Sequence, residues 1–344
     1  MNKEFQIKAL RHTKACKVCN QCDGVACAGQ IPGVGGKGTG STFKRNYAYL
    51  RKVHPLMDPL KSDQEIFTTS DFFGHEVSMP IFGAPIAGMQ PQYQSDVSES
   101  DYAFAMIEGA LKAGTISFTG DGKDLNLFLE PAEMIKQHDY QGVVTIKPWE
   151  LKGLEQRLSK IDTSKLWALA CDIDAAGLLF LRDADPKITN FSVEDIKYLK
   201  RKIHCPLIIK GILTPKAALK ALEGGAEGIV VSNHGGRVLD DTISTIEALP
   251  DIVKVVNKQA KIFIDGGFRS GNDVFKALAL GADGVLIGRP LALEAITEGS
   301  SGVTDYLMRL KQELKETMLM SGANNLSEIT SDKVMIEFEK ECKH

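Results

Sequence analysis

The stretch Gly228-Ile229-Val230-Val231-Ser232-Asn233-His234-Gly235-Gly236-Arg237 begins as a short buried strand and continues as a polar, flexible turn. An unbroken apolar run between turn residues is typical of a strand in a parallel sheet. An imidazole and a guanidinium follow it, three residues apart. His234 can exchange a proton near neutral pH, and Arg237 can bind a carboxylate through two hydrogen bonds. The pattern predicts acid–base chemistry on an anionic substrate, and the structural alternative is a helix-capping His beside a surface Arg.

Similar apolar runs alternate with amphipathic stretches from residue 79 onward. Strands are expected at residues 79–84, 114–119, 142–147, 166–171, 206–210, 228–231, 261–264 and 284–287. Helices are expected at residues 99–112, 131–138, 150–159, 193–203, 215–223, 242–256, 271–280 and 305–319. Pro131 and Pro215 favour helix starts at their positions. The alternation predicts an α/β fold, a (β/α)8 TIM barrel over residues 79–344, with an N-terminal extension over residues 1–78.

Two motifs carry a resemblance to a known family. The first is Ser232-Asn233-His234-Gly235-Gly236-Arg237 with Leu239-Asp240, and the second is Asp265-Gly266-Gly267-Phe268-Arg269-Ser270-Gly271, followed by Ile287-Gly288-Arg289-Pro290. Together they resemble the signatures of the FMN-dependent α-hydroxy-acid oxidases and dehydrogenases, which include glycolate oxidase, lactate oxidase and flavocytochrome b2. The resemblance is strong over residues 207–293 and patchy over residues 80–177.

The resemblance implies where FMN and a substrate are bound. Lys210 is expected beside the flavin, and Arg237 on the substrate carboxylate. Asp172 is expected to hydrogen-bond the catalytic His234, with Asp174 as the alternative. The other implied cofactor-binding residues are Ser232, Asp265, Gly266, Gly267, Arg269, Gly288 and Arg289. Independently of the resemblance, glycines at the ends of the last two strands predict a phosphate site, as is common in such barrels.

The chain departs from the family pattern around the substrate. Lys147 stands where the family has a substrate-binding Tyr, and the second carboxylate-binding Arg of the family has no counterpart, since its position falls near Leu179. Lys147 either replaces the lost positive charge or belongs to a pocket for another substrate.

Four cysteines lie close together near the N-terminus, at Cys16, Cys19, Cys22 and Cys27. Thiolates this close in sequence can bind one metal centre, and zinc and an iron–sulfur cluster are the two candidates. Reduced thiols without metal are the structural alternative. The resemblance gives no account of this segment.

Residues 31–42 are rich in glycine. Such a stretch can cradle a phosphate, but it follows no strand and matches no nucleotide-binding fingerprint. A connector or lid over the barrel mouth is the favoured interpretation.

The composition places the chain among ordinary globular proteins. It has 344 residues, 43% of them hydrophobic and 25% charged, and a net charge of −3. This charge offers no basis for binding nucleic acid or an anionic membrane. No stretch is apolar enough to span a membrane, and the N-terminus lacks the apolar core of a signal peptide, so the cytoplasm is the expected compartment. A homo-oligomer is expected.

The leading interpretation is an FMN-dependent enzyme that oxidises a small 2-hydroxy acid, such as lactate or glycolate, to the 2-oxo acid. An electron-acceptor protein is a candidate partner. The alternatives are another FMN barrel enzyme, similar to the flavin-dependent isopentenyl diphosphate isomerase, and a non-catalytic redox sensor that binds flavin or metal.

Overall fold

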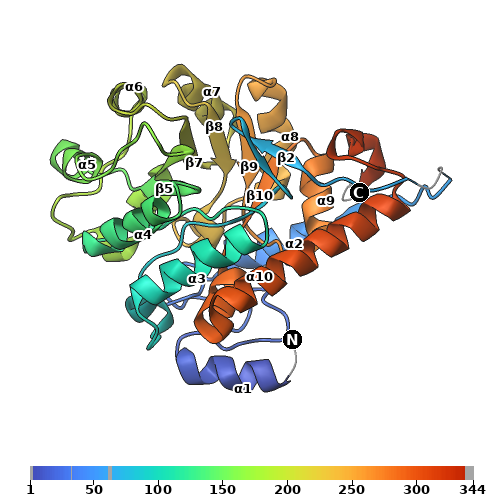
Figure 1. Cartoon of the computed structure of the whole chain (residues 1–344), viewed down its shortest axis with the longest axis horizontal. Helices are drawn as coiled ribbons and strands as arrows, with labels where there is room; N and C mark the ends of the chain where they lie inside the picture. Colours follow the sequence, from blue (N-terminus) through green and yellow to red (C-terminus); the bar gives the residue numbers. More distant parts are fainter. Residues whose placement is uncertain (1–2, 32, 61–63, 338–344) are drawn as a thin grey trace, which may run out of the picture.

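A curled parallel sheet forms the centre of the computed structural model, which describes residues 3–31, 33–60 and 64–337 (Figure 1). Its strands follow the order β4-β10-β9-β8-β7-β6-β5. Their bounds are β4 (Ile81–Gly83), β5 (Val143–Ile146), β6 (Ala168–Asp172), β7 (Leu207–Ile212), β8 (Gly228–Val231), β9 (Lys261–Ile264) and β10 (Gly284–Ile287). Within this sheet, the strand that comes last along the chain, β10, pairs with the one that comes first, β4. The predicted α/β fold with a parallel sheet is therefore confirmed.

The stretch 114–119 differs from its prediction, because it forms no named strand. It makes one bridge to each neighbour, Gly83 with Ser117 and Phe118 with Val143. Its backbone makes two hydrogen bonds with Gly83 and two with Val143, so each neighbour contributes a single bridge. The sheet in the described residues has seven strands, and this segment lies between β4 and β5.

Helices surround the sheet (Figure 1). Their bounds are α3 (Glu99–Lys112), α4 (Asn126–Gln137), α5 (Leu151–Leu158), α6 (Val193–Lys202), α7 (Pro215–Glu223), α8 (Thr245–Val256), α9 (Gly271–Ala279) and α10 (Arg289–Met320). The start of α7 is as predicted, since Thr214 caps it and Pro215 takes the first turn. The predicted start at Pro131 is wrong: α4 begins at Asn126, after a turn in which the Asn126 N–H donates to Asp124 Oδ1, and Pro131 lies inside the helix. The last helix begins earlier than predicted and kinks at Gly299, whose φ of 65° lies outside the helical range.

The N-terminal segment lies against the sheet and its helices. It contains α1 (Lys3–His12), α2 (Ser41–Leu50), β1 (Val53–Pro55), β2 (Ser70–Phe72) and β3 (His75–Val77). Strand β1 pairs antiparallel with β11 (Val334–Ile336) near the other end of the chain, and β2 pairs with β3. The division of the chain at residue 78 stays a prediction, and residues 1–2, 32, 61–63 and 338–344 lie outside the described part.

Short turns complete the chain: η1 (Met89–Tyr93), η2 (Ile173–Gly177), η3 (Leu179–Leu181), η4 (His234–Gly236), η5 (Leu326–Glu328) and η6 (Ser331–Lys333). In the described part of the chain, no helix combines the length and apolar character needed to cross a membrane.

A buried ion pair holds the segment that follows β5. The Arg157 guanidinium donates to both oxygens of Asp121 at 3.0 and 3.1 Å, and both side chains are almost fully buried. Asp121 also accepts from the Trp149 indole at 2.6 Å and from the backbone N–H of Lys147 at 2.9 Å. One carboxylate therefore ties the backbone of Lys147 to α5.

Replacement of Arg157 by Met is expected to lower the free energy of unfolding by about 3–5 kcal/mol, because it leaves the Asp121 charge buried and unpaired. Urea unfolding followed by circular dichroism measures this loss. The control is Arg45→Met, which breaks the more exposed Arg45–Glu247 pair and should cost about 1 kcal/mol or less. Equal small losses for both variants would contradict the role given to the buried pair.

Candidate active site

A pocket opens at the carboxyl ends of the strands. Side chains near the carboxyl ends of successive strands line it: Lys147, Asp172, Lys210, His234, Asp265 and Arg289. In parallel α/β sheets this edge is where ligands bind. The polar residues predicted from the strand ends are therefore brought together in one cavity.

Two lysines and an aspartate form the floor of this pocket. Asp172 Oδ1 accepts from Lys210 Nζ at 2.9 Å, and Asp172 Oδ2 accepts from Lys147 Nζ at 3.4 Å. Burial acts to raise the pKa of Asp172, but the adjacent charges of His234, Lys210 and Lys147 outweigh it and hold the pKa well below its usual range. Asp172 is thus a permanent carboxylate.

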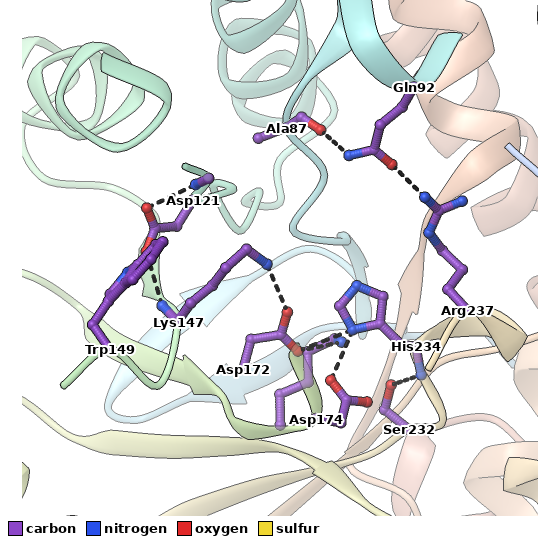
Figure 2. A network of polar contacts seen from close by, with 12 residues as sticks. Ala87, Gln92, Asp121, Lys147, Trp149, Asp172, Asp174, Ser232, His234 and Arg237 are labelled. Carbon is purple, nitrogen blue, oxygen red and sulfur yellow. Dashed lines mark hydrogen bonds and ion pairs between the residues drawn. The ribbon is translucent and has the colours of Figure 1, made fainter. Parts of the chain in front are cut away.

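Two carboxylates lie beside the His234 ring, both on its Nδ1 side (Figure 2). Its Nδ1 is 2.7 Å from Asp174 Oδ1 and 3.5 Å from Asp172 Oδ1. The shorter contact is with Asp174, the alternative named from the sequence, because η2 turns the chain back beneath the ring directly after β6. Burial raises the pKa of Asp174 against the opposing effect of Lys210 and His234. Ser232, expected at the cofactor, accepts a hydrogen bond on its Oγ from the His234 backbone N–H at 3.1 Å.

Arg237 is buried beside His234 and has no carboxylate partner in the described residues. Its guanidinium donates to the carbonyl oxygen of Gly33 at 2.5 Å and to Gln92 Oε1 at 2.8 Å, both neutral acceptors. Burial, together with the charge of Arg289, lowers the pKa of Arg237 to about 10. Figure 2 shows Lys147 and Arg237 on opposite sides of the His234 ring. A buried guanidinium whose partners are all neutral can bind an anionic ligand, because the ligand supplies the opposite charge.

Arg289 is a second guanidinium, partly buried, that lacks a carboxylate partner in the part of the chain that the structure describes. It donates to the carbonyl oxygens of Val34 at 2.7 Å and Gly235 at 2.9 Å, and its carbon Cζ lies 3.9 Å from the centre of the Phe43 ring. Burial lowers the pKa of Arg289. The glycine-rich segment (residues 31–42) therefore presents carbonyl oxygens to both arginines. Within this segment, Val34 lines the pocket.

Comparison with known proteins identifies the family to which this chain is similar. The family model of FMN-dependent dehydrogenases matches residues 180–336. A peroxisomal (S)-2-hydroxyacid oxidase of Arabidopsis thaliana is 46% identical over 333 residues, which cover 89% of this chain and 91% of the relative. Glycolate oxidase 2 of Oryza sativa is 46% identical over 307 residues, covering 78% and 80%.

The chain belongs to the FMN-dependent α-hydroxy-acid oxidase family. Solved structures agree: mandelate oxidase with (S)-2-phenylpropionate superposes with a TM-score of 0.75 at 25% identity over 97% of both chains. A mandelate oxidase variant with (S)-mandelic acid gives a TM-score of 0.74 at 25% identity, over 89% of this chain and 92% of that chain. The family and the cofactor predicted from the two motifs are confirmed, and the comparisons favour hydroxy-acid oxidation over the isomerase alternative.

The pocket fits the FMN that this family uses. Two buried oxygens in its wall, Thr145 Oγ1 and Asp265 Oδ1, have no hydrogen-bond partner in the described residues. Buried polar atoms without partners are costly, so both are suited to a bound ligand. Gly266 and Gly267, each with a φ of 93°, bring backbone to the pocket where a side chain would be strained. With Gly288 and Arg289, these residues would hold the cofactor.

Arg269 is also at the pocket wall, but its guanidinium points to the N-terminal segment. Its Nε and Nη2 donate to the carbonyl oxygen of Cys22 at 3.0 and 2.7 Å. The cysteine segment (residues 16–27) therefore contacts the family's flavin pocket directly. All four of its cysteines are half-buried, free thiols.

Several site residues were not found from the sequence. Gln92 and Tyr93 line the pocket from η1, a π-helical turn outside both motifs. Asp240 belongs to the first motif, but no role was predicted for it from the sequence. Its carboxylate accepts from the Thr39 N–H at 2.5 Å and from the Ser41 N–H at 3.1 Å, which ties the glycine-rich segment to the loop of His234. The Leu239-Asp240 pair in the motif was the available signal.

Replacement of Asp240 by Ala is expected to release the glycine-rich segment. Burial acts to raise the pKa of Asp240, but hydrogen bonds from Thr39 and Ser41 outweigh it and lower the pKa to about 2. The bonds are therefore complete above pH ~4 and are lost as the pH falls through about 2. At pH 7, amide hydrogen exchange in residues 33–42 should become several-fold faster. Asp251→Ala, at an exposed position of α8, should leave it unchanged, and unchanged exchange in both variants would contradict this anchor.

Proposed function

We propose that this enzyme oxidises a small 2-hydroxy acid of glycolate or lactate size to the 2-oxo acid, with FMN as the two-electron acceptor. The observation that carries the proposal is the buried Arg237 guanidinium, which has only neutral acceptors and stands beside a carboxylate-bound histidine. A substrate carboxylate would provide the missing negative charge. Displacing the Gly33 carbonyl oxygen for a carboxylate exchanges a neutral hydrogen bond for a charge-assisted pair.

His234 is suited to receive the proton of the substrate hydroxyl. Asp174 at Nδ1 directs the other ring nitrogen, Nε2, away from the carboxylates, and two nearby carboxylates stabilise the imidazolium that forms. Bound FMN supplies the hydride acceptor. Lys210 is held at the floor of the pocket by Asp172, and its buried positive charge would stabilise negative charge on a reduced cofactor.

Lys147 provides the second cation of the substrate site. Its ammonium lies across the ring from Arg237, at the position where the family carries a tyrosine. We assign it to the substrate carboxylate or the developing 2-oxo group, as a replacement for the arginine that is missing near Leu179. Leu178 and Phe180, which also line the pocket, offer apolar contact to a short side chain.

The proposal also includes the closure of the barrel. We propose that the segment 114–119 completes an eight-stranded (β/α)8 barrel, supported by its bridges to β4 and β5. Lactate as the substrate, an electron-acceptor protein, a homo-oligomer and the cytoplasmic location stay predictions.

Replacement of His234 by Ala tests the mechanism. A general base contributes about 10²–10⁴-fold in rate, so bleaching of the flavin absorbance by glycolate or L-lactate without oxygen should slow by about that factor. Stopped-flow absorbance measures it. FMN should remain bound, because Gly267, Gly288 and Arg289 are unchanged.

The matched control is His204→Ala, at an exposed histidine before β7, which should bleach at the wild-type rate. If the His234 variant bleaches as fast as this control with every active hydroxy acid, the assigned base is wrong. If the wild-type protein holds FMN but no 2-hydroxy acid bleaches it, the proposed substrate class is wrong.

A double-mutant cycle tests the two substrate cations. Arg237→Lys keeps a charge but loses the paired donors, and Lys147→Met removes a charge, so each should raise the substrate Kd measured by flavin bleaching. If both cations bind one carboxylate, the free-energy losses of the two changes should not add in the double variant. Additive losses would separate Lys147 from the substrate carboxylate.

A further inference from the structure

A second cavity lies beneath the flavin pocket, between the cysteine segment and α10. It has a volume of about 540 Å³, and all four N-terminal cysteines line it. The family's chemistry uses none of these thiols. Four half-buried sulfur atoms that face one cavity, from a stretch of twelve residues, form a set of ligands for one metal centre.

The segment is held at several points. The Thr13 hydroxyl and the Ala15 N–H both donate to the carbonyl oxygen of Tyr93, at 2.6 and 3.1 Å. Val18 packs with Ala9 of α1 and Leu293 of α10. Together with the bonds from Arg269 to the Cys22 carbonyl oxygen, these contacts hold the loop that carries the thiols on the barrel.

The loop geometry suits sulfur ligands. The Val18 N–H donates to Cys16 Sγ at 3.4 Å, and Arg269 Nη2 donates to Cys22 Sγ at 3.5 Å. Val18 has a φ of 47°, which is strained for a β-branched residue and turns its N–H toward the sulfur. Hydrogen bonds to the ligand sulfurs are among the features that tune iron–sulfur clusters.

The spacing of the thiols favours a cluster over a single ion. Among the described residues, no three of these sulfur atoms all lie within 4.8 Å of one another. A tetrahedral zinc ion with bonds of about 2.3 Å would hold its thiolates about 3.8 Å apart. An iron–sulfur cluster places several atoms between its thiolates and needs a wider arrangement, which a cavity of this size allows.

Charge and position also favour a cluster. Three arginines, Arg269, Arg289 and Arg309, line the cavity and oppose the negative charge of a thiolate-bound cluster, while Asp23 and Glu294 add two carboxylates. The two cavities share wall residues, namely Val34, Tyr93, Arg269 and Arg289. A centre in the lower cavity is therefore separated from the flavin pocket by a single layer of side chains.

We propose that an iron–sulfur cluster of the 4Fe–4S type is bound by Cys16, Cys19, Cys22 and Cys27 and serves as the electron exit of the enzyme. This electron role rests on the proposed function. Oxidation of the hydroxy acid breaks its C–H and O–H bonds, forms the C=O bond and delivers two electrons to the flavin. Those electrons leave one at a time through the cluster to a one-electron acceptor protein, and the two protons go to water.

The first test measures iron and acid-labile sulfide in protein purified without oxygen. About four of each per chain are expected, with an absorbance shoulder beyond that of the flavin. Cys19→Ala and Cys22→Ala should lose most of the iron and sulfide while FMN content is kept. Cys205→Ala, at a buried cysteine before β7, is the matched control and should keep both. Zinc in place of iron, or neither metal in folded wild-type protein, would overturn the proposal.

The second test separates the cluster from the activity. Dithionite reduction of the wild-type protein should produce the low-temperature EPR signal of a reduced cluster, which depends on no substrate. Addition of glycolate or L-lactate without oxygen should produce the same signal as the flavin bleaches. Bleaching without the cluster signal overturns the electron exit alone. A dithionite signal with no bleaching by any hydroxy acid leaves the cluster in place and overturns the proposed function.

Discussion

Burial of arginine charge without carboxylate partners is the constraint on which this site depends. Arg237 is buried and Arg289 is partly buried, and their donors reach only neutral acceptors in the described chain. An uncompensated buried charge is costly, so the fold surrounds each guanidinium with backbone carbonyl oxygens and, at Arg289, with the face of Phe43. Two anions, a phosphate and a carboxylate, are what an FMN enzyme acting on a hydroxy acid must bind.

The other charges of the pocket are paired, and this pairing gives the site its rigidity. Asp172 binds both Lys210 and Lys147 and also lies within 3.5 Å of His234. These groups sit on strand ends whose backbones are fixed by the sheet. The His234 imidazole is thus held by carboxylates at the end of β6 and in the turn after it, while Arg237 and Arg289 donate to carbonyl oxygens of the glycine-rich segment.

The N-terminal segment connects the two cavities. Its glycine-rich part accepts hydrogen bonds from Arg237 and Arg289, and its cysteine part accepts them from Arg269. The same three arginines therefore contact the flavin pocket and the segment beside it. The N-terminal segment thus contributes to the walls of both the flavin pocket and the cavity that the four cysteines line.

Local sequence determined much of this protein. The bounds of β8, β9 and β10 and of α3 and α7 agree with prediction, because an apolar run between glycines or a capped amphipathic run specifies its own structure. The two motifs determined the family, and their residues His234, Arg237 and Arg289 line one pocket together with Lys210 from β7. Other features depend on contacts between residues far apart in the sequence. The weak pairing of 114–119 is set by its two neighbours, and the choice of Asp174 over Asp172 is set by the turn after β6. Only the tertiary structure decided that Arg237 has neutral partners and that the cysteines share a wall with the flavin pocket, because burial and charge pairing are properties of the packed chain.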